Sequence, residues 1–71
     1  MKREPVKSSS IRSIGYDTAT QTLEIEFQRR GTFHYYAVPE FVYRALMLAT
    51  SKGSYFNDRI ANHYKQSEVA R

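Results

Sequence analysis

The sequence predicts a single α+β domain in which a three-stranded antiparallel β-meander is followed by two helices packed on one face of the sheet. Two patterns support this fold class: residues 22–27 alternate between apolar and polar side chains, and apolar residues recur at helical spacing after Pro39. A chain of 71 residues also has room for only one core. We expect a flexible basic and serine-rich arm at residues 1–9, a domain at 10–64 and a frayed tail at 65–71.

The first strand is expected in IRSIGYD, residues 11–17. Ile11 and Ile14 differ in parity, so a regular strand cannot direct both toward the core. A β-bulge, eased by Gly15, would reconcile them. The segment DTATQ then predicts a turn beginning at Asp17, because this carboxylate can accept hydrogen bonds from nearby backbone NH groups.

The second and third strands are expected at residues 22–27 and 32–37, joined by a three-residue loop in which Gly31 is left-handed. This loop, Arg29-Arg30-Gly31, predicts four facing pairs: Gln28 with Thr32, Phe27 with Phe33, Ile25 with Tyr35, and Leu23 with Ala37. Phe33 and Tyr35 then face the helices, while His34 opposite Glu26 and Tyr36 opposite Glu24 face away. A loop of two or four residues would reverse these faces.

Two helices are expected after the strands. Pro39 suits a first helical position, and the apolar stripe that follows it comprises Phe41, Val42, Ala45, Leu46 and Ala49. TSKGS ends this helix with Gly53 left-handed, and Ser54 caps a second helix that runs to about Tyr64. The predicted core is Ile14, Leu23, Ile25, Phe27, Phe33, Tyr35, Val38, Val42, Ala45, Leu46, Phe56 and Ile60, with Tyr16 at its boundary.

Composition narrows the classes of function. Eleven Lys and Arg residues against seven acids give a net charge of +4, which favours polyanionic partners, although the basic residues are scattered along the chain. The chain has no cysteine, which excludes disulfides and thiolate metal sites and fits a reducing compartment. It has no apolar run long enough to span a bilayer, so we expect a cytoplasmic protein without a membrane partner.

Taken in order, SSSIRSIGYD, QTLEIEF, the aromatic pair in FHY, VPEFVYRAL and SKGSYFND–RI resemble the KTSC domain. This small domain occurs alone in bacteria and phages and at the C-terminus of some lysyl-tRNA synthetases. The resemblance covers about residues 6–64. The family's central Tyr-x-Tyr is Phe33-His34-Tyr35 here, which favours a packing role at the first position and argues against a catalytic phenol. The family's association with a tRNA synthetase implies an RNA-binding role.

We therefore expect a non-catalytic nucleic-acid-binding module, with RNA as its partner. Its phosphate contacts would come from Lys7, Ser8, Ser9, Arg29, Arg30, Lys52, Ser54 and Arg59. The exposed sheet face should not take part, because Glu24 and Glu26 there would repel phosphate.

Each of these candidates also has a structural interpretation. A serine of the 8–10 cluster can bond backbone NH groups where the first strand begins, and Gly53 and Ser54 can simply turn and cap a helix. Tyr55 and Asn57 could contact a base, although Tyr55 could equally spread over the sheet edge.

The sequence favours neither a metal site nor an enzyme. His34 and His63 are not spaced as a ligand pair, and no serine lies in a nucleophile elbow, so we expect no catalytic residue, no metal and no cofactor. The alternative function is a protein-interaction adaptor or a homodimer. It would use a sheet edge or the apolar residues Tyr43, Met47 and Leu48, which exceed one helix stripe.

Overall fold

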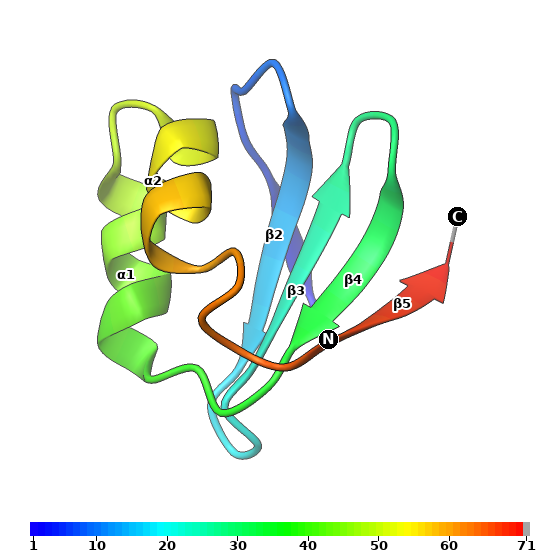
Figure 1. Ribbon diagram of the computed structural model, residues 1–71, viewed down its shortest axis with the longest axis vertical. Coiled ribbons are helices and arrows are strands. Elements are labelled where there is room, and N and C mark those ends of the chain that lie inside the picture. Colours follow the sequence, from blue (N-terminus) through cyan, green and yellow to red (C-terminus); the bar gives the residue numbers. More distant parts are fainter. Residues whose placement is uncertain (71) are drawn as a thin grey trace.

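The computed structural model describes residues 1–70, except the side chain of Ala70, and contains a five-stranded antiparallel sheet with two helices on one face (Figure 1). The predicted α+β class and the meander followed by two helices are confirmed. The sheet order is β1 (Arg3–Pro5), β2 (Ile11–Asp17), β3 (Thr22–Phe27), β4 (Gly31–Tyr35) and β5 (Gln66–Ala70). Helices α1 (Glu40–Leu48) and α2 (Lys52–Arg59) lie between β4 and β5 in the chain.

Both edge strands come from segments that the sequence predicts to lie outside the domain. In the predicted arm, β1 pairs with β2, and in the predicted tail, β5 pairs with β4; Arg71 lies outside the described residues. All three residues of β1 are exposed, so backbone pairing places it there without an apolar signal, and Pro5 is tolerated at an edge. A Cβ on Gly15 would lie 2.7 Å from the backbone oxygen of Lys2, which explains why β1 can approach β2 so closely.

The predicted bulge in β2 is confirmed. The register shifts between Ile11 and Ser13, and Ile11 and Ile14 are both fully buried. Arg12 is the extra residue and is exposed. The bulge therefore lies before Gly15. The missing side chain of Gly15 allows β1 to approach β2 and does not form the bulge. Asp17 starts the next turn as predicted, with its Oδ1 accepting a hydrogen bond from the Ala19 amide at 3.0 Å.

The predicted pairing of β3 with β4 is wrong by two residues. Phe27 faces Gly31, Ile25 faces Phe33 and Leu23 faces Tyr35, because the loop is Gln28-Arg29-Arg30. Gly31 follows it with the expected positive φ, of 91°. A shift of two residues preserves the face of every side chain. Tyr35 is accordingly fully buried, and Phe33 is half-buried and packed against the core.

Helix α1 is rotated relative to the predicted stripe. Val42 and Leu46 are buried with Tyr43 and Met47 packed beside them, whereas Phe41 is 72% exposed. The cause is the stacking of Tyr43 on Tyr16, with ring centroids 4.8 Å apart, which draws that side of the helix inward. The prediction of Phe41 on the buried stripe is therefore wrong, and Pro39 is the N-cap residue, not the first helical residue.

Helix α2 begins earlier and ends earlier than predicted. Its N-cap is Ser51, whose Oγ accepts a hydrogen bond from the Ser54 amide at 3.3 Å, so Ser54 is not the cap. Gly53 lies within the helix and does not have a positive φ. The helix ends at Arg59, and Ile60 is buried just beyond it.

The core lies between the helices and one face of the sheet. Ile11, which the prediction omitted, is fully buried, whereas Phe33 and Ala45 are only half-buried. The other ten predicted core residues are buried: Ile14, Leu23, Ile25, Phe27, Tyr35, Val38, Val42, Leu46, Phe56 and Ile60. Within residues 1–70, neither helix has the length and apolar character needed to cross a membrane.

Candidate functional site

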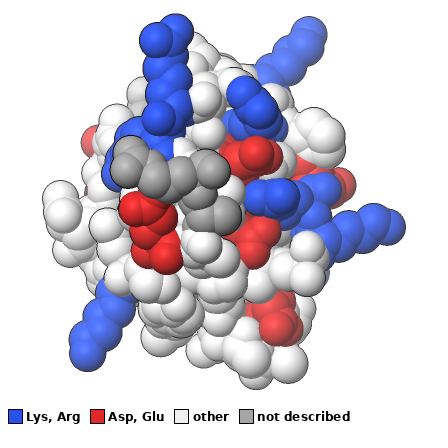
Figure 2. Space-filling view, turned by 90° about the vertical axis from the view of Figure 1, so that its right-hand side faces the viewer, with Lys and Arg blue, Asp and Glu red and all other residues white. Residues whose placement is uncertain are grey.

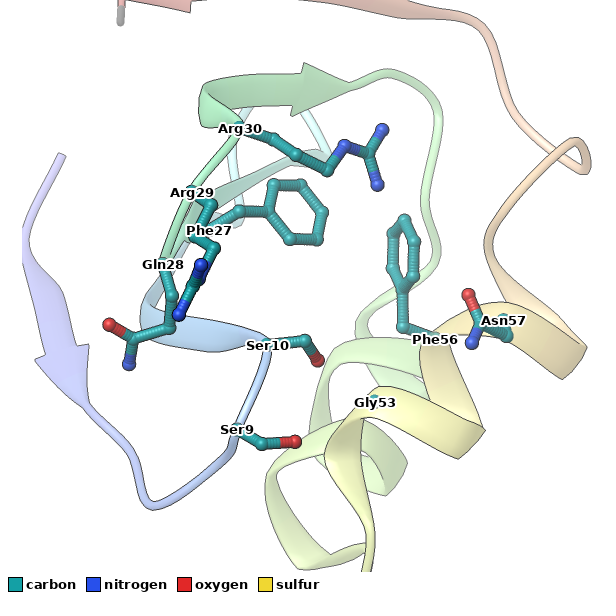
Figure 3. A pocket seen from close by; sticks show the side chains of 9 residues that line it. All are labelled: Ser9, Ser10, Phe27, Gln28, Arg29, Arg30, Gly53, Phe56 and Asn57. Carbon is teal, nitrogen blue, oxygen red and sulfur yellow. The ribbon is translucent and has the colours of Figure 1, made fainter.

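A cavity of about 430 Å³ opens where the β3–β4 hairpin, the serines before β2 and helix α2 meet (Figure 3). We call this site the hairpin cavity. Its volume falls in the usual range for small-ligand sites. It is lined by Ser9, Ser10, Phe27, Gln28, Arg29, Arg30, Gly53, Phe56 and Asn57.

The apolar floor of the hairpin cavity is part of the core. Phe27 and Phe56 are only 5% and 4% exposed, and their rings meet edge to face with centroids 5.2 Å apart. Phe56 makes a second edge-to-face contact, with the fully buried ring of Tyr35. These ring contacts make the floor of the cavity a close-packed part of the core.

The Tyr35 hydroxyl behind this floor is buried and has no hydrogen-bond partner among the described residues. Burial raises the pKa of this hydroxyl, because the charged form would lose its hydration, and the charge of Arg30 acts in the opposite direction. The family's second motif tyrosine is thus a packing residue that carries an unsatisfied polar atom.

Arg30 crosses the cavity and Arg29 lies beside it. The Arg30 guanidinium carbon lies 4.6 Å from the centroid of the Phe27 ring and 5.4 Å from that of Phe33, which are cation–π distances. Figure 3 shows the Arg30 side chain running over Phe27 toward Phe56 and Asn57. Within residues 1–70, neither arginine forms a salt bridge, and no carboxylate lines the cavity. Both positive charges are therefore available to an anionic ligand.

Hydroxyl and amide groups form the rim. Among residues 1–70, the side chains of Ser9 and Asn57 make no hydrogen bond, and Ser10 Oγ has only a 3.5 Å contact with Ser8 Oγ. A Cβ on Gly53 would lie 2.8 Å from Ser10 Oγ, so the absence of a side chain lets the serine segment approach α2. Ser8 itself accepts hydrogen bonds from the Ser10 and Ile11 amides, both at 3.2 Å, which confirms its structural interpretation.

The start of α2 is bonded internally. Ser51 Oγ donates to Ser54 Oγ at 3.0 Å, and Lys52 Nζ donates to the carbonyl of Ala49 at 3.2 Å. The side chains of Ser51, Lys52 and Ser54 therefore serve the turn between α1 and α2 and the N-terminus of α2. Ser51, and not Ser54 as we expected, is the N-cap.

The structure brings together only part of the predicted site. Ser9, Arg29 and Arg30 line the hairpin cavity, whereas Lys7, Ser8, Lys52, Ser54 and Arg59 do not. The prediction missed Ser10, Phe27, Gln28, Gly53, Phe56 and Asn57 as lining residues. Asn57 is a residue that the sequence predicts as a possible contact to a base. For Phe27 and Phe56, the patterns indicated only burial, because they say nothing of which core residue borders a cavity.

The open face of the sheet, opposite the helices, has a different electrostatic character. Glu24 lies 3.2 Å from the Arg3 Nε and 2.6 Å from the His34 Nε2 through its two carboxylate oxygens. Glu26 accepts a hydrogen bond from Ser13 at 2.8 Å. Figure 2, which looks toward this side, shows acidic side chains interspersed with basic ones. No continuous positive surface covers the described part of this side.

The two histidines lie apart and in different surroundings. His34 is bonded to Glu24 on the open face, whereas His63 is exposed beyond α2. Within residues 1–70, no group of three or more His, Cys, Asp or Glu side chains is placed to hold a metal ion.

Comparison with known proteins identifies the family. The family model of the KTSC domain matches residues 7–64, which is most of the chain. The chain belongs to the KTSC domain family. A crystal structure of a KTSC domain protein from Yersinia pestis is similar over 97% of both chains, with 40% sequence identity and a TM-score of 0.96.

Relatives of this KTSC domain occur both alone and within a larger enzyme. An uncharacterised protein of Stutzerimonas stutzeri is 46% identical over 66 residues, which are 92% of this chain and 93% of the relative. A lysine–tRNA ligase of Nostoc punctiforme is 36% identical over 64 residues, which are 90% of this chain but 11% of the ligase. The KTSC domain thus matches a small part of that ligase.

Proposed function

We propose that this KTSC domain binds RNA without catalysing a reaction, and that the hairpin cavity is the centre of its binding surface. The observation that supports this most strongly is that one cavity holds Arg29 and Arg30 together with hydroxyl and amide groups. Within residues 1–70, the two arginines form no salt bridge, and the side chains of Ser9 and Asn57 form no hydrogen bond. Guanidinium groups suit phosphate because they can donate two parallel hydrogen bonds to its oxygens.

One further observation supports a polyanionic partner in general, and a second favours RNA among polyanions. The chain has a net charge of +4, which raises the rate of encounter with any polyanion. A lysine–tRNA ligase contains a related segment, and such an enzyme handles RNA. Lys7 adds a contact with the phosphate backbone outside the cavity. Lys52 Nζ donates one hydrogen bond to the Ala49 carbonyl within residues 1–70, and an ammonium has two further donors that can contact phosphate.

The test is a fluorescence-anisotropy titration of labelled tRNA and single-stranded RNA at low and moderate salt. We expect binding that weakens with salt, because each phosphate contact releases a counterion. Changing Arg29 and Arg30 together to alanine should lower the affinity about tenfold and reduce the salt dependence.

Arg44→Ala is the control for loss of a positive charge outside the hairpin cavity. Arg44 is paired with Glu40 on α1 at 2.8 Å and lines a different cavity. The double variant removes two positive charges and Arg44→Ala removes one, so the changes in affinity are compared per charge removed. We expect Arg44→Ala to change the affinity less than twofold. Absence of RNA binding by the unchanged protein, or binding that does not respond to salt, would contradict the proposal.

A second candidate function is homodimerisation through the outer side of α1. Phe41 and Leu48 are 72% and 85% exposed and lie seven residues apart, which places them on one side of the helix two turns apart. Tyr43 and Met47, which we expected to share this surface, are packed against the core. Sedimentation over a concentration series tests this candidate: self-association that Leu48→Ser abolishes would support it, and a monomer at every concentration would oppose it.

A further inference from the structure

The hairpin cavity combines a flat cation with an apolar floor, which phosphate binding alone does not require. Arg30 lies over the Phe27 ring, 4.6 Å from its centroid, while remaining exposed and lining the cavity. A guanidinium placed in this way offers a planar surface on which a second flat group can stack. Phosphate has no flat apolar group to place there.

The rim offers hydrogen bonds to the edge of such a flat group. Asn57 carries a donor and an acceptor on one amide, and within residues 1–70 neither is used. Gln28 is less available, because its side chain already accepts from Arg12 at 3.3 Å and donates to the Ile11 carbonyl at 3.4 Å. Ser9 and Ser10 add hydroxyls on the opposite side of the cavity (Figure 3).

These features match a nucleobase more closely than any other part of an RNA. A base has two flat apolar faces and an edge of hydrogen-bond donors and acceptors, whereas ribose has no flat aromatic face and phosphate is charged. The volume of about 430 Å³ can hold one nucleotide but not a base pair within a helix. The base must therefore be unstacked, as in a single-stranded segment or a loop.

We propose that the hairpin cavity holds one unstacked base of single-stranded RNA. The face of the base stacks on Arg30, the edge of the base forms hydrogen bonds with Asn57, and Arg29 contacts a neighbouring phosphate. This inference rests on the proposed RNA binding and adds that the base, as well as the backbone, contributes to affinity. Arg30 is then the residue that distinguishes a base-bearing strand from a bare polyanion.

The test compares a short single-stranded RNA with a ribose-phosphate strand of the same length that lacks every base. The two strands carry the same charge, so the ratio of their affinities isolates the contribution of the bases. For the unchanged protein we expect the base-bearing strand to bind about fivefold tighter or more, since stacking of one base on a protein side chain has an effect of this order.

Arg30→Lys and Arg29→Lys are matched variants, because both keep the charge and remove a planar guanidinium. Arg30→Lys should reduce the preference for the base-bearing strand to less than about twofold, and Arg29→Lys should leave it unchanged. A thermal midpoint close to that of the unchanged protein shows that each variant is folded.

The outcomes separate the two proposals. If the unchanged protein binds both strands equally, with salt dependence, the base-binding inference is wrong and RNA binding through phosphate stands. If it binds neither strand, the proposed function itself fails. If the preference for bases is present but Arg30→Lys does not reduce it, the base lies elsewhere on the surface and the inference is overturned.

Discussion

The open face of the sheet and the hairpin cavity use charged residues in opposite ways. On the open face, Glu24 is bonded to both Arg3 and His34, so charges are neutralised within the protein. In the cavity, Arg29 and Arg30 form no salt bridge within residues 1–70. The comparison shows that the placement of unpaired arginines is more informative than the net charge of +4, which does not distinguish these two regions.

Arginine has a different role in each of these two regions. Arg3 lies on the edge strand β1, and its contacts with Glu24, at 3.2 Å, and Glu26, at 3.9 Å, attach that strand to the sheet. Arg30 instead covers an aromatic ring at the end of the sheet, and within residues 1–70 it forms no salt bridge. We therefore expect substitutions on the open face to alter stability, and those in the cavity rim to alter binding.

The largest expected effect concerns the floor of the cavity, which belongs to the core. Phe56→Ala should lower the free energy of unfolding by about 3–5 kcal/mol, because it removes a buried ring that packs on both Phe27 and Tyr35. In a domain of this size such a loss leaves much of the protein unfolded. Chemical denaturation followed by circular dichroism measures it, with Phe56→Leu as the milder control. A loss below 1 kcal/mol would show that the floor is not part of the core.

A smaller effect is expected from the network on the open face. Glu24→Gln keeps the shape of the side chain but removes the charge that both Arg3 and His34 contact, so stability should fall by about 1–2 kcal/mol. Asp58→Asn is the control, because Asp58 is exposed on α2 and the charge change is identical; we expect about 0.5 kcal/mol or less. Equal effects for both variants would refute the structural role of the open-face network. Neither variant should weaken RNA binding.

The smallest expected effects on stability come from removing two tyrosine hydroxyls, those of Tyr16 and Tyr35. The Tyr16 hydroxyl donates to the Val38 carbonyl, so Tyr16→Phe should cost about 1 kcal/mol. The Tyr35 hydroxyl is buried without a partner among the described residues, so Tyr35→Phe should be neutral or stabilising by about 1 kcal/mol. Denaturant titration of both variants measures this difference in sign. A clear loss of stability in Tyr35→Phe would mean that this hydroxyl has a partner in solution.

The same tyrosines predict a dependence on alkaline pH. Burial raises the pKa of Tyr35, and burial together with Glu40 and Asp17 raises that of Tyr16. Above an unfolded value of about 10, the unfolded chain loses these protons first, so the folded state holds more protons and stability falls as pH rises. Tyr35→Phe should make this fall shallower. An identical slope in this variant would contradict the direction given for the pKa of Tyr35.

The sequence predicted the centre of the fold better than its edges. Alternation located Thr22–Phe27 as a strand, and the parity of Ile11 and Ile14 indicated the bulge. The sequence correctly predicted which side chains of β4 face the core, although the predicted register of β4 was wrong. An error of two residues leaves every side chain on the same face of the sheet. The sequence does not predict the edge strands, because backbone pairing and, in β1, the contacts of Arg3 leave no apolar pattern in exposed residues such as Arg3–Pro5.

The candidate site was predictable only in its parts. The hairpin arginines and the serine cluster were identified from residue type and position, but nothing in the sequence indicates that both lie beside Gly53–Asn57. That proximity depends on how α2 packs against the sheet and on the missing side chain at Gly53. The sequence favours Lys52 and Ser54 as phosphate contacts because of their place near a predicted helix N-terminus, yet both side chains form local hydrogen bonds.

The most direct test of the central claim is to map RNA contacts by backbone amide chemical shifts in the labelled protein. The cavity account predicts that single-stranded RNA perturbs the amides of Ser9 and Ser10, the hairpin at residues 28–31 and α2 near Gly53–Asn57, and leaves the open face unchanged. The contrary result would be perturbation centred on His34, Tyr36 and Ser67. On that face two rings already meet edge to face at 6.1 Å, and bases would then be stacking on the open sheet.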